Sequence, residues 1–127
     1  MERIKEFSQG GQKFVYIDLS GTQTNDDVRR LTDEARERIS QYSPESVLTI
    51  TNAENIRIDT ETKDILGQYL TANKPYVKHG AIIGIDGIKK FMVNTMLLVS
   101  NRKNFLIARS FDHAVELLLD YAGKQKE

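Results

Sequence analysis

The stretch that decides the fold is HGAIIGIDGIKKFM, which spans residues 79–92. Its first half, HGAIIGI, is short, continuously apolar and rich in β-branched residues, a pattern typical of a strand buried on both faces. A Gly-x-x-Gly segment, GIDG, follows, and two lysines then lead into apolar residues with helical spacing. We therefore expect a strand over residues 79–85, a turn at Gly84 and Gly87, and a helix over residues 87–100.

Apolar runs alternate with amphipathic stretches through the rest of the chain. The Gly-Gly pair in SQGGQ supplies the positive φ angles of a two-residue hairpin turn, so we expect a hairpin formed by residues 4–8 and 13–19. Two further strands are expected at SVLTIT, residues 46–51, and at NFLIA, residues 104–108.

Helices are expected over residues 24–42, from Asp59 to the ANKP segment at residues 72–75, and over residues 110–122. Thr24, Asp59 and Ser110 are suited to cap them. The apolar positions predicted to face inward are Val28, Leu31, Ala35 and Ile39, then Ile65, Leu66, Tyr69 and Leu70, then Phe111, Ala114, Val115, Leu118 and Ala122.

Short strands alternating with helices require parallel strand pairs, because each helix carries the chain back across the sheet. The predicted fold is therefore a single α/β domain over residues 1–127. It should contain a mixed, mostly parallel sheet of about five strands and about four helices.

Composition excludes several classes of function. The 127 residues carry 18 Lys plus Arg against 18 Asp plus Glu, so no general attraction to nucleic acid is expected. The absence of cysteine excludes disulfides, thiolate metal sites and a cysteine nucleophile. No segment is apolar over the length of a membrane span or of a signal-peptide core, so we expect a cytoplasmic protein.

The GIDG segment has three interpretations. An RNA-clamping loop of the KH type is disfavoured, because Asp86 would repel phosphate and the preceding residues predict a strand rather than a helix. A phosphate cradle is disfavoured because neither a Walker pattern nor a third glycine is present. The favoured interpretation is a tight turn, in which Gly84 permits close packing at the strand end and Gly87 an unusual backbone angle.

Asp18, Ser20 and Asp86 form a candidate strand-end loop site, because open α/β sheets bind ligands at the carboxyl ends of their strands. Paired carboxylates bind metals or act as acid and base, which would make the chain an enzyme. The favoured interpretation is that Asp18 accepts hydrogen bonds from turn amides. His79 and His113 lack the partners of a triad or metal cluster, so we expect no catalytic, metal or cofactor site.

The expected helix over residues 87–100 is apolar nearly all round, since Val93 and Leu97 lie opposite its inward face, beside Lys90. Such a helix is covered on both sides. We expect the second apolar side of the helix to pack against another part of this chain, a second copy of the chain or a lipid-like ligand. Lys90, Val93 and Leu97 are the predicted interaction surface.

Three segments together resemble the SpoIIAA-like family of small bacterial proteins, of STAS/Sec14 type. They are YIDLSG, KPYVKHGAIIGIDGIKKFMVNTMLL and SFDHAVELLL, within residues 13–119. The positions that carry the resemblance are Gly84, Gly87, Ile88, Lys89 and Lys90, then Ala114 and Leu118. The resemblance implies a mixed, mostly parallel sheet with helices packed against it.

Anti-sigma-factor antagonists of the wider STAS group imply a phosphorylation switch, in which a serine or threonine lies between a central strand and a helix. The matching region here, TITNAENIRIDTETKDIL, lacks the Ser-Gly pair of that group. Thr60 is the candidate phosphoacceptor, although helix initiation beside Asp59 is the favoured role.

The expected function is that of a non-enzymatic regulatory or protein-interaction module that binds a protein partner or forms a homodimer. The alternative is a Sec14-like carrier of an apolar small molecule. An adaptable pocket would then lie around Met92, Met96 and Leu97.

Overall fold

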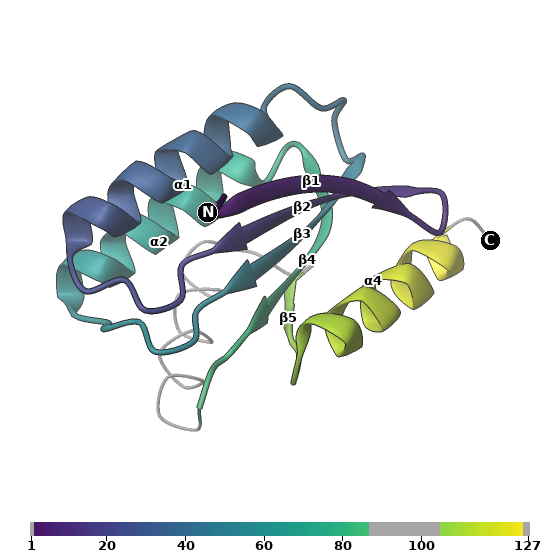
Figure 1. Ribbon diagram of the computed structural model, residues 1–127. Helices are drawn as coiled ribbons and strands as arrows, with labels where there is room; N and C mark the ends of the chain where they lie inside the picture. Colours follow the sequence, from purple (N-terminus) through teal and green to yellow (C-terminus); the bar gives the residue numbers. More distant parts are fainter. Residues whose placement is uncertain (1, 87–104, 126–127) are drawn as a thin grey trace.

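A computed structural model describes residues 2–86 and 105–125 of the chain (Figure 1). These residues form five strands and three helices. In chain order they are β1 (Ile4–Gln9), β2 (Gln12–Asp18), α1 (Asn25–Ile39), β3 (Val47–Asn52), α2 (Thr60–Asn73), β4 (Val77–Ile83), β5 (Phe105–Ile107) and α4 (Phe111–Gln125). Among them, no helix is long and apolar enough to cross a membrane.

The five strands form one sheet in the order β1-β2-β3-β4-β5. β1 is antiparallel to β2, and all the other neighbouring pairs are parallel. The predicted α/β class with a mixed, mostly parallel sheet is therefore confirmed. The helix expected over residues 87–100 lies outside the described residues, and so do Gly87, Lys90, Val93 and Leu97 of the predicted turn and surface.

The hairpin between β1 and β2 forms at the predicted glycine pair. Gly10 and Gly11 have φ angles of 58° and 77°, and Gln9 pairs directly with Gln12. Two consecutive positive φ angles match the right-handed twist of the flanking strands. The chain reverses direction here because glycine reaches these angles without steric cost.

The three predicted helix caps are confirmed. Thr24 Oγ1 accepts a hydrogen bond from the Asp27 amide at 3.2 Å, and Asp59 Oδ1 accepts one from the Thr62 amide at 2.9 Å. Ser110 Oγ accepts one from the His113 amide at 3.1 Å. Each bond satisfies an amide that the helix itself leaves without a partner.

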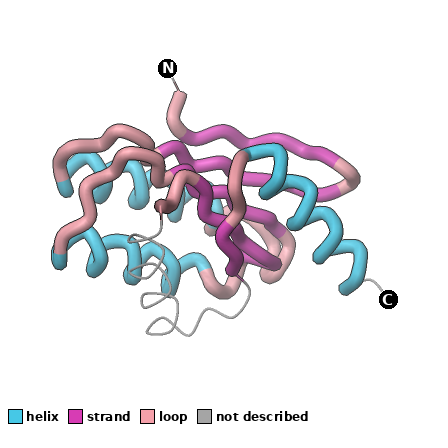
Figure 2. The backbone as a smooth tube through the Cα atoms, turned by 90° about the horizontal axis from the view of Figure 1, so that it is seen from below, coloured by secondary structure: helices cyan, strands magenta, loops and turns pink. Residues whose placement is uncertain are grey.

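Helices cover both faces of the sheet, with α1 and α2 on one face and α4 on the other (Figures 1 and 2). Val15 and Ile17 of β2 face α1 and α2, whereas Phe14 faces α4. Five of the six β3 residues are buried, which explains why that strand is continuously apolar or neutral in sequence.

β4 begins two residues earlier than expected, at Val77, so His79 lies inside the strand rather than at its first position. The His79 ring is 5% exposed and stacks on Tyr121 of α4 with a centroid distance of 3.7 Å. A register irregularity between β3 and β4 turns His79 to the α4 face, together with Leu48. The histidine is thus part of the core on that side.

Candidate functional site at the carboxyl edge of the sheet

The carboxyl ends of β2, β3 and β4 meet at one edge of the sheet, where Asp18 pairs with Asn52 and Asn52 with Ile83. The segments that follow the strands stay together beyond this edge. The Leu19 amide donates to the Asn52 carbonyl at 2.8 Å, and the Ala53 amide donates to the Ile83 carbonyl at 2.9 Å. This edge is therefore closed by backbone hydrogen bonds rather than open between strands.

Asp18 and Ser20 form a turn at the end of β2. Asp18 Oδ1 accepts hydrogen bonds from the Ser20 amide, at 2.9 Å, and from the Ser20 hydroxyl. The Arg3 guanidinium donates to the Ser20 carbonyl at 2.6 Å and lies 3.9 Å from Asp18 Oδ1. The predicted turn role of Asp18 is confirmed, and Arg3 is a partner that sequence reasoning missed.

Asp86 lies beyond the end of β4 and is exposed. Asp18 ends β2 and Asp86 follows β4. Because β3 separates these two strands, their backbones are roughly 10 Å apart. Within residues 2–86 and 105–125, no three carboxylate or histidine side chains cluster as metal ligands would. The two aspartates thus lie at or beyond the ends of strands that are not neighbours in the sheet.

Gly84 serves the turn after β4 in two ways. Its φ angle is +81°, in the region that favours glycine. A Cβ atom at Gly84 would lie 2.6 Å from the backbone nitrogen of Glu54 and 2.8 Å from its Cα. The favoured interpretation of Gly84 as a residue of close packing is thus confirmed, and its neighbour is the segment that follows β3.

A hydrogen-bonded pair, Tyr16 and Asn52, lies on the α4 side of this edge. Asn52 Nδ2 donates to the Tyr16 hydroxyl oxygen at 3.0 Å, and Asn52 Oδ1 accepts from the Glu54 amide at 3.0 Å. Burial raises the pKa of Tyr16, while the hydrogen bond from Asn52 opposes this change. The phenol therefore stays protonated at neutral pH, and sequence reasoning did not identify it.

Four aromatic side chains gather beside this pair, and we call them the aromatic patch: Phe7, Phe14, Tyr16 and Phe111. Phe7 and Phe14 stack with centroids 4.9 Å apart, and the Tyr16 and Phe111 rings meet edge to face at 5.3 Å. Phe111 was expected to face inward but is 37% exposed, the highest value for a large apolar side chain in the described part of the chain. The first residue of α4 lies at the helix end, where less of the sheet covers it.

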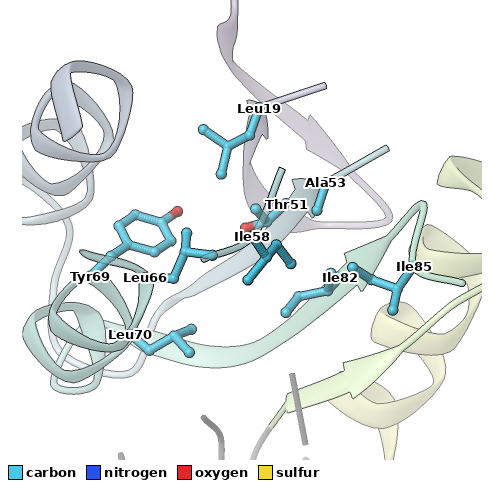
Figure 3. A pocket seen from close by; sticks show the side chains of 9 residues that line it. All are labelled: Leu19, Thr51, Ala53, Ile58, Leu66, Tyr69, Leu70, Ile82 and Ile85. Atoms are coloured by element: carbon cyan, nitrogen blue, oxygen red, sulfur yellow. The ribbon is translucent and has the colours of Figure 1, made fainter. Parts of the chain in front are cut away.

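An apolar cavity of about 20 Å³ lies on the opposite side of the sheet, between α2 and the strand ends (Figure 3). Its lining residues are Leu19, Thr51, Ala53, Ile58, Leu66, Tyr69, Leu70, Ile82 and Ile85. Thr51, the fifth residue of β3, is 5% exposed. The volume is about that of one water molecule.

The start of α2 is tied to the start of α1. Asp59 Oδ1 accepts from both the amide and the hydroxyl of Thr62 at 2.9 Å, and Asn25 Nδ2 donates to it at 3.2 Å. The hydrogen bond from the Thr62 amide is the main cause that lowers the pKa of Asp59. Thr60, the candidate phosphoacceptor, is exposed and is the first residue of α2, so its role in phosphorylation stays a prediction.

Comparison with known proteins adds no relative: neither the models of protein families nor the curated proteins contain a match to this chain. The SpoIIAA-like resemblance therefore stays a prediction.

Proposed function

We propose that the protein is a non-enzymatic interaction module of SpoIIAA-like, STAS/Sec14 type, which recognises a partner protein through its surface. The aromatic patch is the observation that carries this proposal. The order of the described elements, a hairpin followed by parallel strands that alternate with helices, supports the family assignment.

The polar groups at the carboxyl edge support a function without catalysis. General acid-base chemistry needs a carboxylate or imidazole that can reach a substrate proton. Asp18 is occupied by the Ser20 amide and hydroxyl, and Asp59 by the cap of α2. These carboxylates stabilise turns and helix starts.

The aromatic patch has the properties of a recognition surface. Aromatic side chains provide large contact areas and are enriched in the cores of protein interfaces. Phe14 is fully buried and supports the patch from below, since its stacking holds the half-buried Phe7 ring in place before a partner arrives and so reduces the entropy lost on binding. The hydroxyl of Tyr16 keeps its bond with Asn52, so a partner buries an already satisfied polar group.

The charges beside the patch favour a protein as the occupant. Exposed Lys5 lies on the same face of β1 as Phe7, and exposed Asp112 follows Phe111 on α4. An anionic polymer or membrane would need a surplus of positive charge here. A polypeptide surface that packs an apolar side chain on the accessible edges of Phe7, Tyr16 and Phe111 matches both the apolar centre and the mixed charge around it.

The test compares tagged wild-type protein with Phe111→Ser and with the control Glu116→Ser, which changes an exposed residue of the same helix. Each protein is incubated with lysate of its host, and retained proteins are identified by mass spectrometry. We expect a protein that wild type and the control retain equally and that Phe111→Ser loses. Circular dichroism verifies that all three are folded. Equal retention by Phe111→Ser would reject the aromatic patch as the binding surface.

A carrier of an apolar small molecule is the second candidate. The cavity beside α2 has the apolar lining that a carrier needs, but its volume of about 20 Å³ would have to expand to hold a ligand. Met92, Met96 and Leu97, which the carrier would use, lie outside the described residues. Native mass spectrometry of protein purified from its host separates the two functions. A carrier retains a co-purifying molecule of defined mass, whereas an interaction module shows the mass of the chain or of a protein complex.

A further inference from the structure

β1 forms one edge of the sheet, and every second residue of it turns its main-chain groups away from β2 (Figure 1). The Asp18 amide donates to the Arg3 carbonyl at 2.7 Å, so these residues are a hydrogen-bonded pair of the hairpin. Such pairs alternate with non-hydrogen-bonded pairs in an antiparallel ladder, and the main-chain groups of Ile4, Glu6 and Ser8 therefore point outward. An edge of this kind is a template for one more strand.

The chain itself covers only one end of this edge. Arg38 of α1 donates to the Ile4 carbonyl at 3.4 Å. Glu6 and Ser8 are exposed, and no described residue hydrogen-bonds their main-chain amides or carbonyls. Phe7 lies between them and is half-buried on the α4 face of the sheet. The part of the edge that is open for pairing is therefore centred on Phe7.

We infer that β1 pairs with β1 of a second copy of this chain, antiparallel and about a two-fold axis at Phe7. In this register Glu6 lies opposite Ser8 of the second copy, and the two residues exchange main-chain hydrogen bonds. The two-fold axis repeats these bonds, because an isologous contact uses the same residues on both sides. The two sheets become one continuous sheet.

Charge selects this register over its neighbours. An axis at Glu6 would place that residue opposite its own copy, and an axis at Lys5 would do the same with two lysines. Like charges directly opposite destabilise a strand pair. An axis beyond Phe7 would run the ladder into the hairpin turn at Gly10, whose φ angle is 58°. With the axis at Phe7, Lys5 lies opposite the neutral Gln9.

The side chains on both faces fit this pairing. On the α4 face the two Phe7 rings are directly opposite, so the aromatic patches of the two copies join across the axis. On the other face each Glu6 is held within its own chain, by Arg38 at 3.6 Å and by the Tyr42 hydroxyl at 2.7 Å. Lys13 of the second copy lies one strand further on, on the same face, and adds a positive charge there.

This inference goes beyond the recognition of another protein and does not depend on it. Purified chain should pair with itself whether or not Phe111 binds a partner, and a monomer would leave the test of Phe111 unaffected.

Sedimentation velocity over a series of concentrations tests the pairing. Wild type should show a reversible equilibrium of monomer and dimer. Ser8→Pro removes an amide that faces outward, so the hairpin keeps its ladder while each copy loses a hydrogen bond to the other. The dissociation constant should rise at least about tenfold. Ser8→Ala keeps the amide and should dimerise as wild type does, and circular dichroism verifies that the variants are folded. A monomeric wild type, or equal dimerisation by Ser8→Pro, overturns the inference.

The register is tested with single cysteines, because the chain contains none of its own. Phe7→Cys places two thiols opposite each other in a non-hydrogen-bonded pair, where a Cα separation of about 4.5 Å permits a disulfide. Gln9→Cys is the matched control on the same face, since its thiol lies opposite Lys5 and away from the second thiol. With oxidised glutathione as the oxidant, Phe7→Cys should form a covalent dimer at least about tenfold faster than Gln9→Cys. Equal rates overturn the register and with it the inference.

Discussion

Replacing Gly84 with alanine tests the physical basis of the turn after β4. The substitution adds a Cβ atom at a residue whose φ angle is +81°. A left-handed backbone costs an L-residue with a Cβ about 1–2 kcal/mol. The new atom would also lie 2.6 Å from the backbone nitrogen of Glu54, and backbone atoms cannot rotate away as a side chain can. Forcing an extra carbon into packed structure costs a further 1–3 kcal/mol or so, roughly 2–5 kcal/mol in total.

Gly11→Ala is the matched control. Gly11 has a similar φ angle of 77°, but a Cβ atom built there has no neighbour within 4 Å. Only the cost of the left-handed backbone remains, so the free energy of unfolding of the control should fall by about 1–2 kcal/mol. At roughly 4 °C per kcal/mol, Tm should fall by ~4–8 °C for Gly11→Ala and by ~8–20 °C for Gly84→Ala.

Circular dichroism during thermal and urea unfolding measures both variants against wild type. The difference between them isolates the contact with Glu54, since the backbone cost is common to both. If Gly84→Ala loses no more stability than Gly11→Ala, the close approach of the two strand-end segments is not what requires glycine. The reasoning about this edge of the sheet would then be refuted.

Three further predictions concern caps and titrating groups. Thr24→Ala removes the cap of α1 and should cost about 1 kcal/mol, measured by urea unfolding, and a loss below the error of the assay would contradict the role of the cap. Because the pKa of Asp59 is lowered in the folded protein, its carboxylate stabilises the fold above the unfolded value of 3.8, and this effect is lost as pH falls below that value. The urea midpoint of wild type should therefore decline more steeply below pH 3.8 than the midpoint of Asp59→Asn. Burial and the hydrogen bond to Glu6 raise the pKa of Tyr42 to about 12, so its stabilising effect is present below pH 10.0 and is lost as pH rises toward 12. Absorbance titration at alkaline pH should detect a tyrosine that titrates near 12, and Glu6→Gln should lower that pKa part of the way toward 10.0, because burial remains; identical titration curves would reject the interaction.

Only part of the candidate site could be predicted from the sequence. The turn role of Asp18 was predictable, because its partner Ser20 is two residues away. Arg3, which donates to the Ser20 carbonyl from 17 residues away, was not. Likewise, glycine at position 84 was recognised as a packing residue, but the sequence does not name Glu54 as the residue against which it packs.

The sequence alone determined the elements that the structure describes and most of their buried residues, Phe111 excepted. The hairpin at Gly10 and Gly11, the caps at Thr24, Asp59 and Ser110, and the apolar strands depend on residues within about one helical turn or on the simple repeat of strand and helix. Only the tertiary structure decided which side chains meet, since the aromatic patch and the cavity of Thr51 each join elements far apart along the chain. The physical reason is that caps and turns are stabilised by hydrogen bonds between near neighbours, whereas contacts across a sheet depend on strand order and register, which no local pattern specifies.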